Sequence, residues 1–291
     1  MSSQQRVLLI GATSSIGEEL LRLLLKEYIK IRVLIRKPEM VSQFEAMGCE
    51  VFLGDIRKLE SYTSALKNVD KLFCVYPDSP DRFTVERDLI DEAVRMNVGH
   101  VIKVSAYAAG LEPPVSFGIL HAQADGYLQQ SGLNWTILRP YAFMQNALLV
   151  ADLIVQRRIL LGPFGNARVS FVDAWDIAVV AKNVIVEAGY ENKVFELTGP
   201  EAITYGDMAK TLSGQLGHRI RYLALPFWLI RIFMKRSGMS DWELSQMKDL
   251  VKMIRANGES NVTDTIQNVA KQPPRNFETF VENHTRFFKA G

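Results

Sequence analysis

Residues Arg6–Tyr28, RVLLIGATSSIGEELLRLLLKEY, decide the fold of this chain. The apolar run Val7–Ile10 predicts a buried strand, a turn of small residues follows it, and from Ile16 onward leucines recur at helical spacing. Strand, turn and helix in this order form the first half of a βαβ unit. Such a turn directs backbone N–H groups and a helix N-terminus toward one point, which favours an anion such as a cofactor diphosphate. We therefore expect a diphosphate-binding turn made of Gly11, Ala12, Thr13, Ser14, Ser15, Ile16 and Gly17.

The turn departs at one position from the glycine pattern that is usual for dinucleotide sites. Gly11 and Gly17 fit the outer positions of G-x-x-G-x-x-G, but Ser14 occupies the middle position. Ser14 can offer a hydroxyl to the phosphates, at some loss of room for the backbone to approach them. A glycine pattern alone is weak evidence, so the assignment depends on the rest of the chain.

Strands continue to alternate with helices as far as Leu138. Further buried strands are expected at Ile31–Ile35, Glu50–Leu53, Lys71–Val75, His100–Val104 and Trp135–Leu138, with helices at Leu59–Leu66, Asp81–Met96 and Ser116–Gln130. This alternation predicts an α/β protein with a Rossmann-type, doubly wound parallel sheet that helices cover on both faces. Ligands of such sheets bind beyond the carboxyl ends of the strands.

The residues that follow the second strand indicate which cofactor the turn binds. A site for an unphosphorylated dinucleotide usually carries an acidic residue there, but this chain has Arg36 and Lys37. Two cations favour a 2′-phosphate, because arginine engages it through two charge-assisted hydrogen bonds. Simple surface charge is the alternative for this pair, and the glycine turn makes NADP(H) the better interpretation. Asp55 can accept from the adenine amino group or cap a helix. The other expected cofactor contacts at this edge are Ile56, Val75, Tyr76, Pro77, Pro140 and Tyr141.

The second half of the chain changes character. It is expected to contain helices at Ala142–Arg157 and Ala174–Glu187, a turn at Gly162–Asn166, and a strand at Lys193–Leu197 that returns to the main sheet, followed by a mainly helical region with one short strand near Ile220–Leu223. We expect residues 1–141 and about 169–198 to form the NADP-binding domain. Residues 142–168 and 199–291 would form a smaller α/β substrate-binding lobe.

Composition narrows the class of protein. The net charge is +2 and no basic run is interleaved with aromatic residues, so nucleic acid is not an expected partner. No apolar run reaches the length of a membrane span, and MSSQQ at the N-terminus carries no secretory signal. Cys49 and Cys74 are the only cysteines, which favours buried thiols in a reducing cytoplasm and no metal set.

Several motifs give the chain a family resemblance. GATSSIG, RK and GD after the first three strands resemble the short-chain dehydrogenase/reductase superfamily. SGLNWTILRPYAFMQN at Ser131–Asn146 is similar to a stretch of its atypical NmrA-like branch, as are VSFVDAWDIA at Val169–Ala178 and FELTGPEAITYGDMA at Phe195–Ala209. The similarity weakens after about Leu225. This resemblance implies either an NADPH-dependent quinone, imine or dye reductase, or a redox-sensing regulator without turnover.

The chain departs from the superfamily at its catalytic pair, Tyr-x-x-x-Lys. When the carboxylate that follows this pair is aligned with Asp125, His121 takes the lysine position and Phe117 takes the tyrosine position. NmrA-like reductases often have histidine there, so the resemblance implies that activity need not be lost. His121 is a candidate proton donor, since the unperturbed pKa of histidine is about 6.5. The alternatives are that it positions the cofactor or only pairs with Asp125 one helical turn away.

Two further residues complete the candidate catalytic set. Ser105 matches the active-site serine of the superfamily and could bond a substrate carbonyl, or its hydroxyl could only cap a turn. Tyr107 is the nearest phenol and could replace the missing acid. Phe117, Phe143, Met144 and Asn146 are expected to line the substrate cavity. Trp228 lies in PFWLIRIFM, which could be a lid wall, a surface element, or a packing surface within the chain or a dimer.

Together these features predict a cytoplasmic NADPH-dependent reductase of a small aromatic, quinone-like or imine-like acceptor. Such acceptors are already electrophilic, and general acid catalysis typically contributes about 10²–10⁴-fold, so a missing tyrosine is tolerable. Two alternatives remain open: an NADP(H) redox sensor without turnover, and a non-redox cyclase or isomerase on the same fold. A small-molecule substrate is the expected partner, and homodimerisation is left open.

Overall fold

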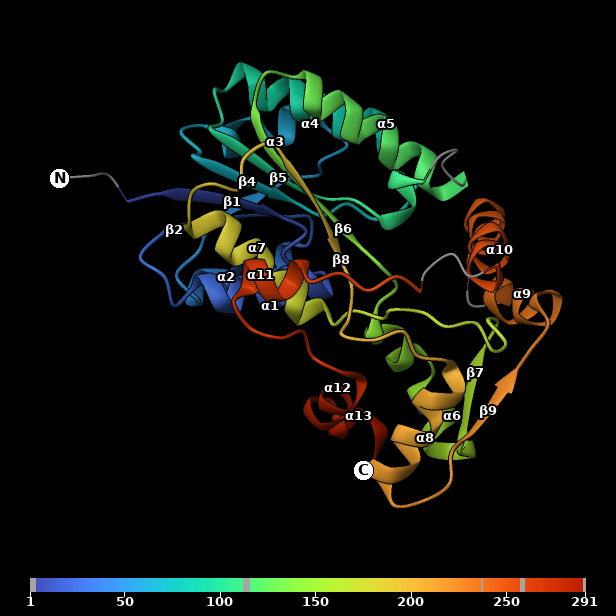
Figure 1. The fold of residues 1–291 in the computed structure, drawn as a ribbon. Helices are drawn as coiled ribbons and strands as arrows, with labels where there is room; N and C mark the ends of the chain where they lie inside the picture. The colour runs from blue at the N-terminus through green and yellow to red at the C-terminus, as the bar shows by residue number, and fades with distance from the viewer. Residues whose placement is uncertain (1–3, 112–115, 237, 257–259, 290–291) are drawn as a thin grey trace. The chain divides into compact units, whose positions relative to one another are not determined.

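The computed structural model describes residues 4–111, 116–236, 238–256 and 260–289 (Figure 1). The chain divides into two compact units. Unit 1 comprises residues 1–114, 118–139 and 177–196, and unit 2 comprises residues 115–117, 140–176 and 197–291. The boundaries expected from the sequence lie close to these. The assignment of cofactor binding to one unit and substrate binding to the other stays a prediction.

A seven-stranded sheet forms the centre of unit 1, with the strand order β3-β2-β1-β4-β5-β6-β8. Its strands are β1 (Arg6–Ile10), β2 (Lys30–Ile35), β3 (Glu50–Leu53), β4 (Lys71–Cys74), β5 (His100–Val104), β6 (Asn134–Pro140) and β8 (Lys193–Leu197). The pairs from β3 through to β6 are parallel. The predicted fold class is confirmed, as is the return of residues 193–197 to this sheet. The strand order reverses between β1 and β4, the point where such sheets bind ligands.

Helices cover both faces of this sheet, with α4 and α5 on one face and α1 and α7 on the other (Figure 1). The elements between the strands are α1 (Ser15–Leu24), η1 (Pro38–Met40), α2 (Val41–Ala46), α3 (Leu59–Tyr62), η2 (Thr63–Leu66), α4 (Arg82–Arg95), η3 (Tyr107–Gly110), α5 (Ser116–Gln130) and α7 (Ala174–Val186). Alternate strand residues such as Leu8 and Ile10 pack with Leu89 and Leu128 of α4 and α5. The sequence did not predict α2, because Phe44 is its one buried side chain and leaves no periodic pattern.

Unit 2 has a two-stranded parallel sheet of β7 (Ile159–Gly162) and β9 (Arg221–Ala224). Its other elements are η4 (Met144–Val150), α6 (Ala151–Arg157), α8 (Tyr205–Leu216), α9 (Phe227–Arg236), α10 (Asp241–Arg255), α11 (Thr265–Ala270), α12 (Phe277–Asn283) and α13 (Thr285–Phe288). The single helix predicted over residues 142–157 is wrong, because a 3₁₀ helix precedes α6. Strand β7 was also missed. It starts directly after Arg158, whose left-handed backbone ends α6. Among the described residues, no helix combines the length and apolar character that a membrane crossing requires.

His100, at the start of β5, makes the stability of unit 1 depend on pH. It is 3% exposed, and its Nε2 lies 2.9 Å from Thr136 Oγ1, which donates to the Tyr190 carbonyl. Burial, reinforced by the charge of Lys71, lowers the pKa of His100 to about 4. In the unfolded chain the pKa is about 6.5, so the unfolded state binds the proton first as pH falls.

We therefore expect the free energy of unfolding to fall by about 2–3 kcal/mol between pH 7.5 and pH 4.5 because of this residue. Urea unfolding at both values should show this loss in the wild type. The loss should be smaller by that amount in His100→Gln. His218→Gln, at a partly exposed position in unit 2, is the control and should keep the wild-type loss. An equal loss in His100→Gln would contradict the assignment.

Candidate functional site

The turn after β1 is built around two glycines that no other residue can replace without strain. Gly11 has φ +86°, and a Cβ atom on it would lie 2.5 Å from the carbonyl oxygen of Val75, which follows β4. A Cβ on Gly17 would lie 2.1 Å from the carbonyl oxygen of Gly11. The turn is therefore packed tightly, with β1, α1 and the end of β4 in close contact.

Ser14 is the N-cap of α1, and its hydroxyl is used within the turn. Its Oγ donates to the Gly11 carbonyl at 2.8 Å and accepts from the Gly17 N–H at 3.0 Å. Thr13 and Ser15 beside it are exposed, whereas Ala12 and Ile16 are buried. Because the one proton of Ser14 is committed to Gly11, an anion at this turn would be bound by backbone N–H groups. The serine stabilises the turn that presents those groups.

Two cations at the end of β2 are available to a ligand. Arg36 and Lys37 are exposed, and in the described ranges neither forms an ion pair. Both follow the strand that neighbours β1, at the same edge as the glycine turn. The residues present therefore fit a dinucleotide that carries a phosphate on its adenosine ribose.

The remaining predicted cofactor residues occupy varied surroundings. Asp55 Oδ1 accepts from the Arg57 N–H at 3.0 Å, and the N-cap of α3 is Lys58, so the helix-cap alternative for Asp55 is wrong. Ile56 and Tyr76 are buried, Val75 is half-buried and Pro77 is exposed. Pro140 and Tyr141, which belong to unit 2, are buried. Their contact with a cofactor stays a prediction.

A cluster of buried ions lies beside the carboxyl ends of β4, β5 and β6. Side chains alternate along a strand, so Lys103 shares the α4 and α5 side of β5 with Val101. The Lys103 Nζ lies 2.8 Å from Asp125 Oδ1 of α5 and 3.2 Å from Glu86 Oε2 of α4. All three of these side chains are at most 3% exposed.

Two arginines complete this cluster. Arg139 Nη2 of β6 lies 3.0 Å from Asp125 Oδ2, and Arg82 Nη1 of α4 lies 2.8 Å from Glu86 Oε1. Arg82 also donates to the carbonyl of Tyr76 through Nη2. We call Arg82, Glu86, Lys103, Asp125 and Arg139 the buried ion cluster.

Asp125 and Lys103 of the buried ion cluster keep their charges in the folded protein. Burial opposes the charged form of Asp125, but Lys103 and Arg139 outweigh burial and hold the pKa of this carboxyl below its usual range. Burial likewise opposes the charged form of Lys103, and Glu86 with Asp125 raises the pKa of its amine above the usual value. Asp125 is therefore a permanent acceptor, and Ser105 Oγ donates to its Oδ2 at 2.9 Å.

His121 joins this cluster to solvent. Its Nδ1 lies 3.4 Å from Ser105 Oγ, and its Nε2 lies 3.0 Å from Oδ1 of Asp78, a residue that also pairs with Arg82. Burial lowers the pKa of His121; Arg82 and Lys103 lower it further, and the hydrogen bond to Asp78 opposes them. The imidazole is thus neutral near pH 7, between a serine hydroxyl and a carboxylate.

The structure brings two of the predicted catalytic residues together and corrects one alternative. Ser105 and His121 are adjacent as expected. The predicted pair of His121 with Asp125 is wrong, because Asp78 takes the histidine while Asp125 binds Lys103, Arg139 and Ser105. The competing cations on β5 and β6 hold Asp125 away from its own helix neighbour. Tyr107 is buried in η3, two residues beyond Ser105.

The predicted substrate residues all belong to unit 2. Phe117 and Phe143 are half-buried, Asn146 is exposed, and Met144 packs in the core of that unit at 2% exposure. Trp228 of α9 is 65% exposed. Their role in substrate binding stays a prediction.

Four residues that hold this site together were not predicted from the sequence: Asp78, Arg82, Glu86 and Lys103. The first three recur at a spacing of four, which places them along one side of α4 and its N-terminal end. Lys103 is a lone charge in the apolar strand HVIKV. The signal that could have revealed them is a lysine at an inward strand position together with charged residues that recur every four positions at the preceding helix.

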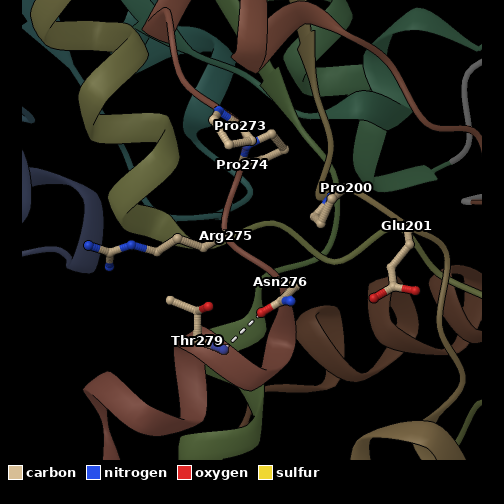
Figure 2. Close-up of a pocket in the computed structure, with 7 residues that line it drawn as sticks. All are labelled: Pro200, Glu201, Pro273, Pro274, Arg275, Asn276 and Thr279. Atoms are coloured by element: carbon tan, nitrogen blue, oxygen red, sulfur yellow. Dashed lines mark hydrogen bonds between the residues drawn. The ribbon is translucent and has the colours of Figure 1, made fainter.

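Unit 2 has its own surface hollow, of about 600 Å³, which lies between Pro200–Glu201 and the segment Pro273–Thr279 (Figure 2). The Asn276 side chain caps α12 there by accepting from the Thr279 N–H at 2.8 Å. No predicted site residue lines this hollow. Within the described part of the chain, no group of three or more His, Cys, Asp or Glu side chains could hold a metal ion.

The chain is similar to several known proteins. The family model described as NAD(P)H-binding matches residues 11–174. NAD(P)H azoreductase of Xenophilus azovorans is 31% identical over 284 residues, which cover 98% of this chain and 99% of that protein. Quinone oxidoreductase 2 of Escherichia coli is 27% identical over 84% of this chain and 86% of its own length.

Solved structures show the same architecture. The NADPH-dependent quinone oxidoreductase QOR2 of Escherichia coli, complexed with NADPH, superposes with a TM-score of 0.86 at 25% identity and covers 96% of this chain and 99% of its own. Triphenylmethane reductase of Citrobacter sp. has a TM-score of 0.84 at 20% identity, with 96% and 99% covered. The second likeness concerns the fold alone.

Proposed function

The chain belongs to the NAD(P)H-binding family, in the NmrA-like branch of atypical short-chain dehydrogenases/reductases, and we propose its activity from this membership. The proposed activity is the NADPH-dependent reduction of small aromatic acceptors of the quinone, imine or azo class. The membership confirms the predicted family and the predicted nicotinamide dinucleotide cofactor. The observation that carries the proposed activity is the buried pair of Ser105 and His121 at the end of β5, where the family's usual phenol is absent.

The cofactor would be held by unit 1. Backbone N–H groups of the Gly11–Gly17 turn would bind the diphosphate, and Arg36 with Lys37 would bind the 2′-phosphate. When bound, the cofactor supplies a hydride. The protein's own residues then supply orientation and a proton.

The acid in this site is weak, which limits the acceptor. Phe117 stands where ordinary members of the superfamily have tyrosine, so no phenol at that position can polarise a carbonyl. Ser105 and His121 supply a proton without strong activation. Electrophilic acceptors tolerate this, and unactivated ketones do not. The names of the relatives, an azoreductase and a quinone oxidoreductase, support acceptors of that kind.

The test is NADPH oxidation with a quinone, an azo dye, an iminium salt and an unactivated ketone. We expect turnover of at least one of the first three and none of the ketone. His121→Ala should lower kcat by about 10–100-fold with the azo acceptor, because general acid catalysis is lost. The affinity for NADPH, measured by calorimetry, should stay unchanged. His218→Ala is the control and should keep full activity. Tight NADPH binding without turnover of any acceptor would overturn the proposal and favour a redox sensor.

A further inference from the structure

We infer that Asp78 is a positioning residue that makes the His121–Ser105 pair a proton donor to the reacting acceptor. This inference rests on the proposed reductase function and adds to it a residue that the sequence did not reveal. It concerns residues of unit 1 alone. The three side chains form one line, in which the Asp78 carboxylate meets His121 Nε2 at 3.0 Å and His121 Nδ1 meets Ser105 Oγ at 3.4 Å.

The line runs from solvent into the protein. The Asp78 side chain is 56% exposed, whereas His121 and Ser105 are 3% and 4% exposed. Asp78 lies in the segment between β4 and α4, and Arg82 Nη2 fixes the same oxygen, Oδ1, at 3.0 Å. Its carboxylate therefore has a defined position, and this position faces the outer nitrogen of the imidazole.

The inner end of the line is polarised by Asp125. Ser105 donates its one proton to Asp125 Oδ2, so the lone pairs of Ser105 Oγ face His121 Nδ1. A neutral imidazole carries one N–H and here meets two acceptors, Asp78 and Ser105. Its N–H donates to the Asp78 carboxylate. A lone pair of His121 Nδ1 then faces a lone pair of Ser105 Oγ across the long 3.4 Å contact. When Nδ1 also binds a proton, the imidazolium donates to both Asp78 and Ser105.

Each charged element around His121 acts on that added proton. Arg82 of α4 and Lys103 of β5 oppose it, while Asp78 favours it. Asp125, on His121's own helix, pairs with Lys103. Glu86 and Arg139 lie behind these groups and pair with Lys103, Arg82 and Asp125. Among the residues that the structure describes, Asp78 is the carboxylate that bonds the imidazole directly, so we expect its removal to change proton binding most.

The proton balance of the step is simple. The step starts from the protonated form of His121. As the acceptor is reduced, Ser105 Oγ–H would turn from Asp125 Oδ2 and give its proton to the heteroatom that becomes negative. The imidazolium Nδ1–H then returns a proton to Ser105 Oγ, and His121 is left neutral with its Nε2–H on Asp78. Solvent restores the proton on Nδ1 after the product leaves. The reduction of a quinone, a neutral imine or an azo acceptor thus consumes one hydride and one proton.

Asp78→Asn keeps the shape of the side chain and removes the charge that favours the imidazolium. Proton binding by His121 is weaker without this charge-assisted hydrogen bond, so we expect the falling limb of log kcat against pH to move down by about 1–2 pH units. Asp78→Glu should recover part of the shift. Asp81→Asn, three residues along the chain and paired with Arg57, is the matched control and should keep the wild-type profile. A loss that is equal at every pH would mean a merely structural role and would overturn the inference.

A second readout separates this inference from the reductase proposal. The chain has four histidines, so an NMR titration of the imidazole carbons can be assigned with single His→Gln variants. We expect His121 in Asp78→Asn to titrate about 1–2 pH units below the wild type. An unchanged His121 titration would overturn the role of Asp78, whether or not an acceptor is known. The expected shift, combined with no turnover of any acceptor, would instead overturn the proposed function.

Discussion

Replacing Arg36 and Lys37 together by alanine is expected to lower kcat/KM for NADPH by about 100-fold and to leave that for NADH within about twofold. The two side chains are exposed and unpaired in the described ranges, so they lose no partner within the protein when they are truncated. Each charge-assisted bond to a phosphate contributes about 1.5–3 kcal/mol, and solvent screening at an exposed site favours the lower end of that range. NADH has no 2′-phosphate, so its kcat/KM should change little.

Steady-state kinetics with both cofactors at one ionic strength would measure the effect. Arg22→Ala with Lys26→Ala is the matched control, because it removes two exposed cations, one from the last turn of α1 and one just after that helix. This control should leave the preference for NADPH unchanged. If the Arg36 and Lys37 variant weakens both cofactors equally, the pair is only surface charge and the predicted 2′-phosphate site is wrong.

Lys103→Met is expected to destabilise unit 1 by about 3–5 kcal/mol, because it leaves Glu86 and Asp125 buried without the cation between them. Methionine has nearly the same length as lysine, so the loss is electrostatic and not a cavity effect. Thermal unfolding should show a midpoint lower by about 10 °C. Urea unfolding followed by circular dichroism at pH 7.5 would give the free energy.

The control for Lys103→Met is Lys182→Met. Lys182 pairs with Glu27 at 3.4 Å, but both side chains are partly exposed, so the expected loss is below about 1 kcal/mol. Adding Glu86→Gln and Asp125→Asn to Lys103→Met removes the uncompensated charges and should restore part of the stability. A single Lys103→Met variant within 1 kcal/mol of the wild type would show that water or another group compensates these carboxylates.

The architecture of unit 1 was predictable because its signals are local. Buried parallel strands are continuous apolar runs, and the helices between them repeat leucines at helical spacing, as in Val7–Ile10 and the helix after it. The glycine turn is also local, since each glycine makes its close contact within the turn or at the next strand. The choice of Ser105 and His121 as candidate catalytic residues followed from strand order and from the family resemblance.

The partners of those two residues were not predictable in the same way. Asp78 meets His121 across 43 residues of sequence, and Lys103 meets Asp125 across 22. Spacing on one helix suggested the pair of His121 with Asp125, but cations on two strands compete for that carboxylate and bind it more strongly. The pairing of β7 with β9 joins short strands about 60 residues apart, for which the sequence carries no local signal. Charge pairs that depend on tertiary packing are identified from the structure and not from the sequence alone.

The buried ion cluster also governs how unit 1 is completed during synthesis. The ribosome adds Glu86 and Lys103 well before Asp125 and Arg139, so a nascent chain that has just exposed β5 has an amine with one of its two carboxylates. Lys103 of β5 gains its second carboxylate, Asp125, only after α5 has emerged. Asp125 in turn gains Arg139 only after β6 has emerged. Domains generally acquire structure as units in the order of synthesis, and we expect the ion pairs to delay the packing of α4 and α5 on β5 until residue 139 is available. The same chemistry that holds Ser105 in place thus makes fragments ending between β5 and β6 unsuitable for splitting or tagging this protein.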